Sequence, residues 1–327
     1  MLRLWSAGIL FLLTMSASVL HASPASPERW YFTHFTTDDG LAFNSVTSIT
    51  QDSNGFVWFA TEDGLSRYDG RDFKNFTKDD LGIDTDFITA LCADGSGNLW
   101  VGSDNGASRY DFISDSFVPL DAVSDKGTEV RGKVTHICMD DGGLVWMSVN
   151  GLGLFSYDSV TDRLRNFFCE NGRTTLPFNI RTFVIDGNGD FWLSLYFADI
   201  WYSDSSLQKA ERVKIVGWKE NDDIVSMDRN GQGRIILSSW KNGLGEFDCK
   251  KRSFRSYLNY GSGQRPKGMY YDRNNRRIWS ATTRGLCLYD LATGETARLS
   301  SNVQDDFSLS GDNITAVFTD ATGGHWA

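Results

Sequence analysis

The chain has 327 residues and a formal net charge of −10, from 32 Lys and Arg residues against 42 Asp and Glu residues. No cluster of basic residues stands out, which argues against a nucleic-acid partner or docking on anionic lipid, since both need a basic surface. An aromatic content of 13% and only five prolines are typical of a strand-rich globular protein.

Residues 1–25 have the features of an export signal. Arg3 supplies the positive charge, Leu4 to Leu20 is mainly apolar, and Ala22 and Ala25 offer small residues for cleavage. The apolar run is slightly short for a membrane span and contains serine and threonine, so we favour a cleaved signal peptide over an N-terminal anchor. No later segment is apolar enough to cross a membrane, and we expect an exported protein.

One sequence pattern recurs from residue 46 onward. Its first copy, residues 51–76, reads QDSNGFVWFATEDGLSRYDGRDFKNF. Spacings of 42, 46, 46, 44, 43 and 47 residues separate the marker positions, which are Trp58, Trp100, Trp146, Trp192, Ile236, Trp279 and Trp326. A period of roughly 40–50 residues with strand-like segments is the signature of a β-propeller.

Each repeat divides into four short strands. In the first copy they are expected at residues 46–51, 56–61, 65–68 and 72–77, joined by turns rich in Asp, Asn and Gly. One four-stranded sheet cannot bury both of its faces alone, whereas sheets stacked around an axis can. The repeated tryptophans are therefore interpreted as packing residues between blades rather than as a unique site.

The sequence predicts an all-β, seven-bladed-type β-propeller of four-stranded antiparallel blades, with six complete repeats and a partial seventh, in one domain over residues 26–327. The complete blades are expected at about 45–77, 87–120, 133–168, 179–214, 223–258 and 266–300. The partial blade would combine residues 313–327 with residues 30–37, which resemble the last strand of a repeat. We expect a truncated fragment whose open ring is unstable or associates when isolated.

The repeat assigns the loops to two faces. Turns between the first and second strands are stereotyped, whereas second-to-third turns and inter-blade connections vary and lie on the other face, here called the variable face. Variable loops on a rigid scaffold are where binding sites are usually built. Catalytic residues, a metal site and a cofactor are not predicted, because no zinc, EF-hand, phosphate-loop or nucleophile-elbow motif is present.

The fourth and fifth repeats break the pattern on the variable face. An aromatic pair replaces the usual x-x-Gly-Leu in the fourth repeat, and a tryptophan lies beside a cation and an amide in the fifth. Aromatic rings flanked by hydrogen-bonding groups suit a sugar, which has an apolar face and a polar rim; local packing of irregular blades is the alternative. The predicted ligand-binding residues are Tyr196, Phe197, Asp199, Trp240, Lys241, Asn242 and Arg284.

Five cysteines are an odd number, so at least one is free or paired between chains. Cys92 and Cys138 occupy the same repeat position and are interpreted as small buried apolar residues. The turn from Asp186 to Asp190 has oxygens at suggestive spacing for calcium. However, Phe191 stands where an EF-hand needs glycine, and no glutamate follows at the twelfth position.

The run GFVWFATEDGLSRYDG at residues 55–70, preceded by DGLAFNSVTSITQD at residues 39–52, resembles the two-component regulator propeller repeat. The chain is similar to the periplasmic sensor regions of hybrid two-component systems of Bacteroides-type gut bacteria. The resemblance is strongest in repeats one to three and six. It implies an oligosaccharide released from a complex glycan as ligand, a receptor homodimer anchored in the inner membrane, and a histidine kinase output beyond this chain.

The leading hypothesis is a non-enzymatic ligand-sensing propeller. A secreted polysaccharide lyase or glycosidase is one alternative, and it would need paired carboxylates at the channel mouth. A protein-interaction scaffold is the other. The same repeat also precedes outputs such as diguanylate cyclases, and the resemblance implies no ligand residues.

Overall fold

The computed structural model describes residues 30–94, 97–167 and 178–327. The predicted signal peptide and Cys169 lie outside the described residues. All the sheets in the described part of the chain lie in one compact unit, Phe32–Ala327. Among the described residues, no helix has the length and apolar character that a membrane crossing requires.

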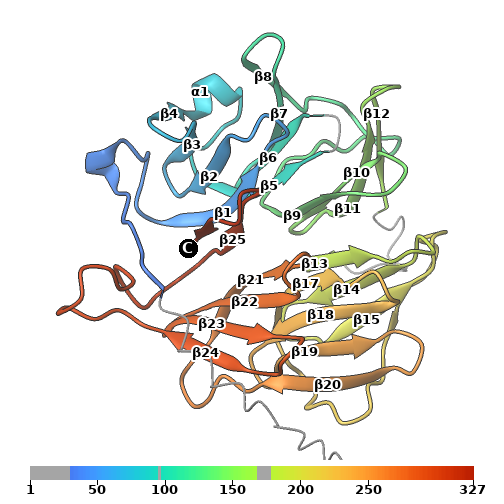
Figure 1. Ribbon diagram of the computed structural model, residues 1–327. Coiled ribbons are helices and arrows are strands. Elements are labelled where there is room, and N and C mark those ends of the chain that lie inside the picture. The colour runs from blue at the N-terminus through green and yellow to red at the C-terminus, as the bar shows by residue number, and fades with distance from the viewer. Residues whose placement is uncertain (1–29, 95–96, 168–177) are drawn as a thin grey trace, which may run out of the picture. The chain divides into compact units, whose positions relative to one another are not determined.

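Six four-stranded antiparallel sheets make up this compact unit, and in each the strands pair in chain order (Figure 1). This confirms the prediction of a β-propeller with four-stranded blades. Blades one to three consist of β1 (Val46–Gln51), β2 (Val57–Thr61), β3 (Gly64–Tyr68), β4 (Phe73–Phe76); β5 (Ile88–Ala93), β6 (Leu99–Ser103), β7 (Ala107–Asp111), β8 (Ser116–Pro119); and β9 (Val134–Met139), β10 (Val145–Val149), β11 (Gly153–Asp158), β12 (Arg163–Asn166).

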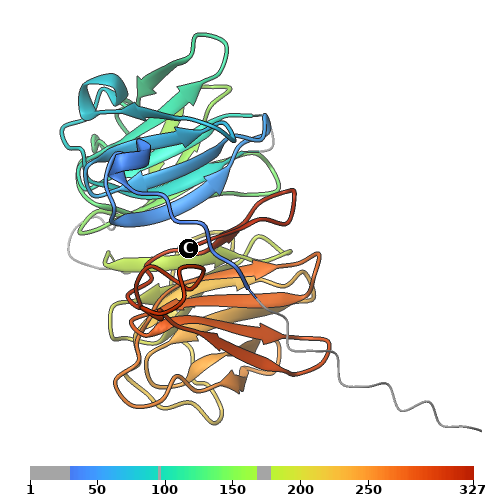
Figure 2. The ribbon, with the colours of Figure 1, turned by 60° about the vertical axis from the view of Figure 1, so that its left-hand side comes forward.

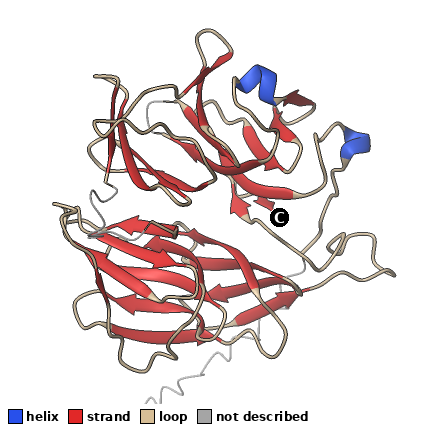
Figure 3. Cartoon of the chain, turned by 180° about the vertical axis from the view of Figure 1, so that it is seen from behind, coloured by secondary structure: helices blue, strands red, loops and turns tan. Residues whose placement is uncertain are grey.

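The other three blades follow the same plan. They consist of β13 (Ile180–Ile185), β14 (Phe191–Leu195), β15 (Ile200–Ser203), β16 (Glu211–Arg212); β17 (Ile224–Arg229), β18 (Arg234–Ser239), β19 (Gly243–Asp248), β20 (Ser253–Leu258); and β21 (Pro266–Asp272), β22 (Arg277–Thr282), β23 (Gly285–Asp290), β24 (Thr296–Leu299). Helical structure in the described chain is confined to η1 (Thr37–Asp39) and α1 (Lys78–Leu81) (Figure 3).

The prediction of a seven-bladed ring is corrected to six blades. Residues of the expected seventh repeat form a separate two-stranded sheet of β25 (Phe318–Thr319) and β26 (His325–Trp326). Residues 30–36 form no strand. A fourth strand needs the free edge of a third strand, and in the described part of the chain no third strand pairs with β26. The six blades are complete because each supplies its own four strands locally.

The two-stranded sheet nevertheless lies between blades six and one, as Figure 2 shows by the proximity of red to orange and blue segments. The Thr315 hydroxyl donates to the carbonyl of Val46 in β1. On the other side, the ring of Phe318 lies 5.1 Å from that of Tyr270 in β21. Trp326 packs 5.3 Å from Phe59 of blade one.

A buried Asp–Trp hydrogen bond explains the sequence signature of the repeat. Trp58 Nε1–H donates to Asp52 Oδ2 over 2.6 Å, and the same carboxylate accepts backbone N–H groups of the turn between the first two strands. Four further repeats contain this bond, in the pairs Trp100–Asp94, Trp146–Asp140, Trp192–Asp186 and Trp326–Asp320. The indole can be buried because the turn satisfies its only donor.

The tryptophans pack between blades, as predicted. Trp58 of blade one lies 5.0 Å from the ring of Tyr110 in blade two, and Trp100 lies 5.4 Å from Tyr157 in blade three. Trp58 and Trp100 are both fully buried. Each blade is therefore stabilised by an aromatic contact with its successor, an arrangement that hides the apolar face of every sheet.

Candidate functional site

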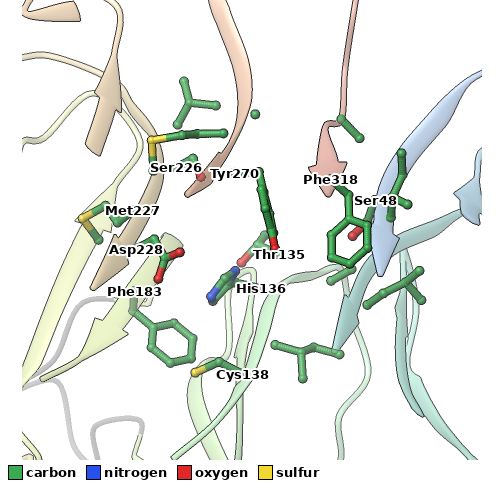
Figure 4. Close-up of a pocket in the computed structure, with 18 of the residues that line it drawn as sticks. Ser48, Thr135, His136, Cys138, Phe183, Ser226, Met227, Asp228, Tyr270 and Phe318 are labelled. Atoms are coloured by element: carbon green, nitrogen blue, oxygen red, sulfur yellow. The ribbon is translucent and has the colours of Figure 1, made fainter. Parts of the chain in front are cut away.

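The first strands of all six blades, together with residues 315–318, line one central cavity of about 500 Å³. Figure 4 shows His136, Asp228 and Tyr270 projecting into it from three different strands. Burial lowers the pKa of His136 to about 4, so this imidazole is neutral at physiological pH. Burial raises the pKa of Asp228, although Arg273 forms an ion pair with its carboxylate.

Ion pairs occupy the region of the stereotyped turns. Arg229 of blade five reaches Asp141 of blade three, with Nη1 donating to Oδ2 over 3.0 Å. These two groups lie on either side of blade four, so the contact joins blades that are not neighbours in the chain. Two of the described residues that line the cavity are acids. Asp140 accepts a hydrogen bond from the Trp146 indole, and Asp228 forms an ion pair with Arg273. Both carboxylates thus have structural partners, and neither forms the isolated acid pair that glycoside hydrolysis requires.

A β-bulge recurs at the second residue of every first strand. In blade one the register shifts between Val46 and Ser48, which leaves Thr47 unpaired with β2. The equivalent bulge residues in the other five blades are Thr89, Thr135, Arg181, Val225 and Lys267. Bulges re-aim side chains and are common next to functional sites.

In blades one to three the bulge residue joins its blade to the next. The hydroxyl of Thr47 donates to the carbonyl of Ile88 over 2.6 Å, and that of Thr89 to Val134 over 2.6 Å. Thr135 donates to the carbonyl of Ile180 over 2.7 Å. We call this contact the threonine staple. It satisfies a backbone carbonyl at the start of each following strand.

Blades four to six lack the threonine staple. Arg181 replaces the threonine in blade four and Lys267 replaces it in blade six. Between blades four and five the equivalent bond comes from Ser194 of β14, whose hydroxyl donates to the carbonyl of Ile224 over 2.8 Å. The bulge position is thereby free to carry a cation, and Lys267 lines the central cavity.

Arg181 belongs to a group of six residues on the variable face of these blades. We call it the aromatic–arginine cluster, and its members are Arg181, Tyr196, Phe197, Asp223, Trp240 and Arg265. The guanidinium of Arg181 lies 5.2 Å from the centre of the Tyr196 ring and forms an ion pair with Asp223. The guanidinium of Arg265 lies 4.5 Å from the centre of the Trp240 ring.

The rings of the cluster are partly open to solvent. Phe197 packs edge-on against Trp240, with ring centres 5.5 Å apart, and is 56% exposed; Tyr196 is 39% exposed. Phe197 also has a φ of +56°, a left-handed conformation that is uncommon for a bulky residue. Large aromatic side chains held in exposed positions by strained backbone are typical of binding sites.

Two buried polar atoms of the cluster have no hydrogen-bond partner in the structure. They are the Nε1 donor of Trp240 and the Oδ1 acceptor of Asp223. Asp223 is only 2% exposed, and its other oxygen receives Arg181. Unsatisfied polar atoms are rare in protein interiors and often mark functional positions.

The structure brings together three of the seven predicted site residues, namely Tyr196, Phe197 and Trp240. Asp199 is instead buried, with Oδ1 accepting from the Trp218 indole over 2.9 Å and Oδ2 paired with Arg212. Burial opposes its ionisation, but the hydrogen bonds that it accepts, led by that from the Asp222 amide, hold the pKa of Asp199 below its usual value. Its role here is to anchor loops.

The other three predicted residues lie around the cluster. Asn242 is buried and bonds to the Asp222 carboxylate over 2.7 Å, so it also supports the loops. Lys241 is exposed and donates through Nζ to the Glu220 carbonyl over 3.1 Å. Arg284 is exposed and donates to the Ser262 carbonyl over 3.3 Å.

Sequence reasoning missed Arg181, Asp223 and Arg265 as residues of this cluster. A signal was present in the alignment of the repeats. The bulge position reads Thr in repeats one, two, three and seven, so a change to Arg181 or Lys267 marks a departure from the scaffold.

Residues 40–63 and 82–105 match the family model of the two-component regulator propeller. Over 91% of this chain, the fold superposes with a TM-score of 0.76 on 40% of the extracellular domain of a protein assigned to the hybrid two-component systems of B. thetaiotaomicron, at 19% identity. A virginiamycin B lyase from Staphylococcus aureus shares the fold at 11% identity and a TM-score of 0.65, over 84% of this chain and 89% of that one.

One curated relative is a protein named histidine kinase P4 from Formosa agariphila. It is 44% identical over 50 residues, which are 15% of this chain and 4% of that protein. The chain therefore spans under half the length of the first sensor structure that it matches, and only a small segment aligns with the kinase. Since the lyase has the same architecture, the fold alone does not separate sensing from catalysis.

Proposed function

We propose that this chain, which carries two-component regulator propeller repeats, is a non-enzymatic ligand-sensing propeller of an exported signal-transduction receptor, and that it binds a glycan-derived oligosaccharide. The observation that carries the proposal is the aromatic–arginine cluster. It departs from the repeat, exposes aromatic rings, and leaves polar atoms without partners. Matches to regulator propeller repeats and to a sensor ectodomain support the same function.

The cluster has the chemistry of a carbohydrate site. The exposed faces of Tyr196 and Phe197 would pack against the apolar face of a sugar ring, while the exposed Arg265 guanidinium would bind its hydroxyl groups. Lys241 and Arg284 would contact the outer part of a longer oligosaccharide. Asp199 and Asn242 would hold the loops that carry these residues.

The receptor context extends the proposal. We place the propeller in the periplasm and its parent protein in the inner membrane, as a homodimer whose kinase output lies beyond this chain. Ligand binding would favour one of two dimer arrangements, as differential affinity requires.

A thermal-shift screen against an oligosaccharide panel tests the proposal. Stabilisation by one glycan class, lost in Phe197→Ala, is the expected result, because that side chain supplies a large exposed ring of the site. Phe43→Ala is the matched control, since Phe43 is 40% exposed and lies before blade one. A folded chain that no glycan stabilises would contradict the proposal, and release of sugar products in the same wells would identify an enzyme instead.

A further inference from the structure

The variable face of blades four to six concentrates positive charge on a chain whose net charge is −10. Its cations are Arg181, Lys241, Arg265, Lys267 and Arg284. Only Arg181 has an acidic partner among the described residues, namely Asp223. The other four side chains are exposed and form no ion pair in the described part of the chain.

Two buried acids beside this face are already engaged. Asp222 accepts the backbone N–H of Lys241 over 2.8 Å and that of Asn242 over 3.0 Å. Asp199 is paired with Arg212. Because these carboxylates are buried in hydrogen-bond networks, they do not neutralise the exposed cations.

Arg265 is the best-positioned of the cations for recognising an anion. Its backbone is held at both ends by Thr283, whose N–H donates to the Arg265 carbonyl over 2.9 Å and whose hydroxyl accepts the Arg265 N–H over 3.0 Å. Its guanidinium stacks on Trp240. A stacked guanidinium keeps its N–H edge free, and that edge matches a carboxylate or sulfate group with two parallel hydrogen bonds.

Lys267 extends this positive region toward the central cavity. It follows Arg265 by two residues at the start of β21 and lines the cavity wall. The equivalent position in blades one to three is an uncharged threonine that serves the scaffold. The cation therefore has no role in joining blades and is available to attract a negatively charged ligand.

We propose, resting on the proposed function, that the ligand is an acidic oligosaccharide whose carboxylate or sulfate group binds the Arg265 guanidinium. Trp240 holds that guanidinium in place, and Tyr196 and Phe197 pack against the sugar ring. Lys267, Lys241 and Arg284 add long-range attraction. The fold and the exposed aromatic rings fit neutral and acidic sugars alike, and the exposed cations favour the acidic class.

Isothermal titration calorimetry of the whole chain tests this inference with matched ligands. One arm uses acidic oligosaccharides built from galacturonate, mannuronate, guluronate or glucuronate. The second arm uses the same compounds after reduction of each carboxyl group to an alcohol, which removes the charge and keeps the linkages. A third arm uses sulfated disaccharides, so that binding confined to the first or third arm identifies carboxylate or sulfate as the recognised group.

One acidic compound is expected to bind at least about tenfold more tightly than its reduced counterpart, the effect of losing a charge-assisted contact. Arg265→Gln should abolish most of that preference. Arg255→Gln is the matched control, because Arg255 is also exposed and stacks on an aromatic ring, 5.7 Å from the centre of Tyr257. Affinity should also fall as salt rises from 50 to 500 mM, by the screening of exposed charges.

Equal binding of the acidic and reduced compounds, lost in Phe197→Ala but not in Arg265→Gln, would overturn the inference and leave the proposed function intact. Failure of every acidic and neutral compound to bind a folded chain would overturn both. Melting temperatures of the Arg265→Gln and Arg255→Gln variants, each within about 2 °C of the parent, establish that lost binding is not lost folding.

Discussion

Blades one to three and blades four to six are built on one repeat but differ at the same structural position. In the first group the bulge residue is a threonine whose hydroxyl joins neighbouring blades. In the second group the bulge residues are Arg181, Val225 and Lys267, and one staple function passes to Ser194. A scaffold contact can thus move to another residue and leave its original position available for binding.

The aromatic residues of the two groups differ in the same way. Trp58 and Trp100 are fully buried, and each has its indole N–H satisfied by an aspartate of its own repeat. Trp240 lies outside the repeated position, has an unpartnered Nε1, and contacts exposed Phe197. Trp240 therefore differs from Trp58 and Trp100 in its position in the repeat and in its contact with an exposed ring, although all three are tryptophans.

The largest expected effect is on folding stability when a packing tryptophan is removed. Trp58→Ala should lower the free energy of unfolding by about 3–5 kcal/mol, because it leaves a cavity between two blades and removes the indole donor from the buried Asp52 Oδ2. Trp240→Ala should lower it by about 1 kcal/mol or less. Urea unfolding followed by circular dichroism measures both, and equal losses would erase the distinction between the two tryptophans.

A substitution that restores the scaffold residue in blade four should also be costly. Arg181→Thr leaves the Asp223 carboxylate buried without its cation, so we expect a loss of about 3 kcal/mol in the free energy of unfolding. Adding Asp223→Asn should recover most of it, since a neutral amide is cheaper to bury. If the double variant is no more stable than the single one, the ion pair is not what holds this junction.

The neutral state of His136 makes stability depend on pH. Its pKa is lowered from 6.5 to about 4 in the folded chain, so between these values the unfolded chain binds more protons. The neutral imidazole therefore contributes to the free energy of unfolding fully above pH 6.5, and this contribution is lost as pH falls to about 4. The loss in the free energy of unfolding is no more than about 3 kcal/mol. Asp228, whose pKa is raised by burial, acts in the opposite direction.

The variant His136→Gln isolates the histidine contribution. Subtracting its unfolding free energy from that of the parent at each pH should give a difference that declines from pH 6.5 to 4 and is flat above. Cys138 and Tyr270 also line the cavity but titrate far above this window. A flat difference across the whole range would mean that the pKa of His136 is the same in the folded and the unfolded chain.

The smallest expected effect concerns a single threonine staple. Thr89→Val keeps the shape of the side chain and removes the hydroxyl that reaches Val134, so the free energy of unfolding should fall by about 1 kcal/mol. Thr296→Val is the control for a general effect of this exchange, because Thr296 is exposed in β24 and its hydroxyl makes no hydrogen bond in the described part of the chain. No loss in Thr89→Val would show that blades one to three gain nothing from the staple.

Signals in the amino-acid sequence were enough to predict the repeat and most of its local structure. The spacing of the tryptophans, the Asp and Gly residues of the turns, and the β-branched strands predicted four-stranded blades, because these signals act within a few residues of one another. The Asp–Trp bond spans only six residues, so its two partners recur together in the sequence. The aromatic pair Tyr196–Phe197 and Trp240 were also found, because they replace expected repeat residues.

Tertiary structure decided the rest. Asp199 and Asn242 look like binding residues in the sequence but point into the loops that they hold, and a side-chain direction of this kind depends on neighbours about 20 residues away. Arg265 comes from blade six and meets Trp240 of blade five only when the blades stack around the axis, as Arg181 of blade four meets Asp223 at the start of blade five. The number of blades also depended on tertiary structure, because a strand joins a sheet only where a neighbouring strand has a free edge.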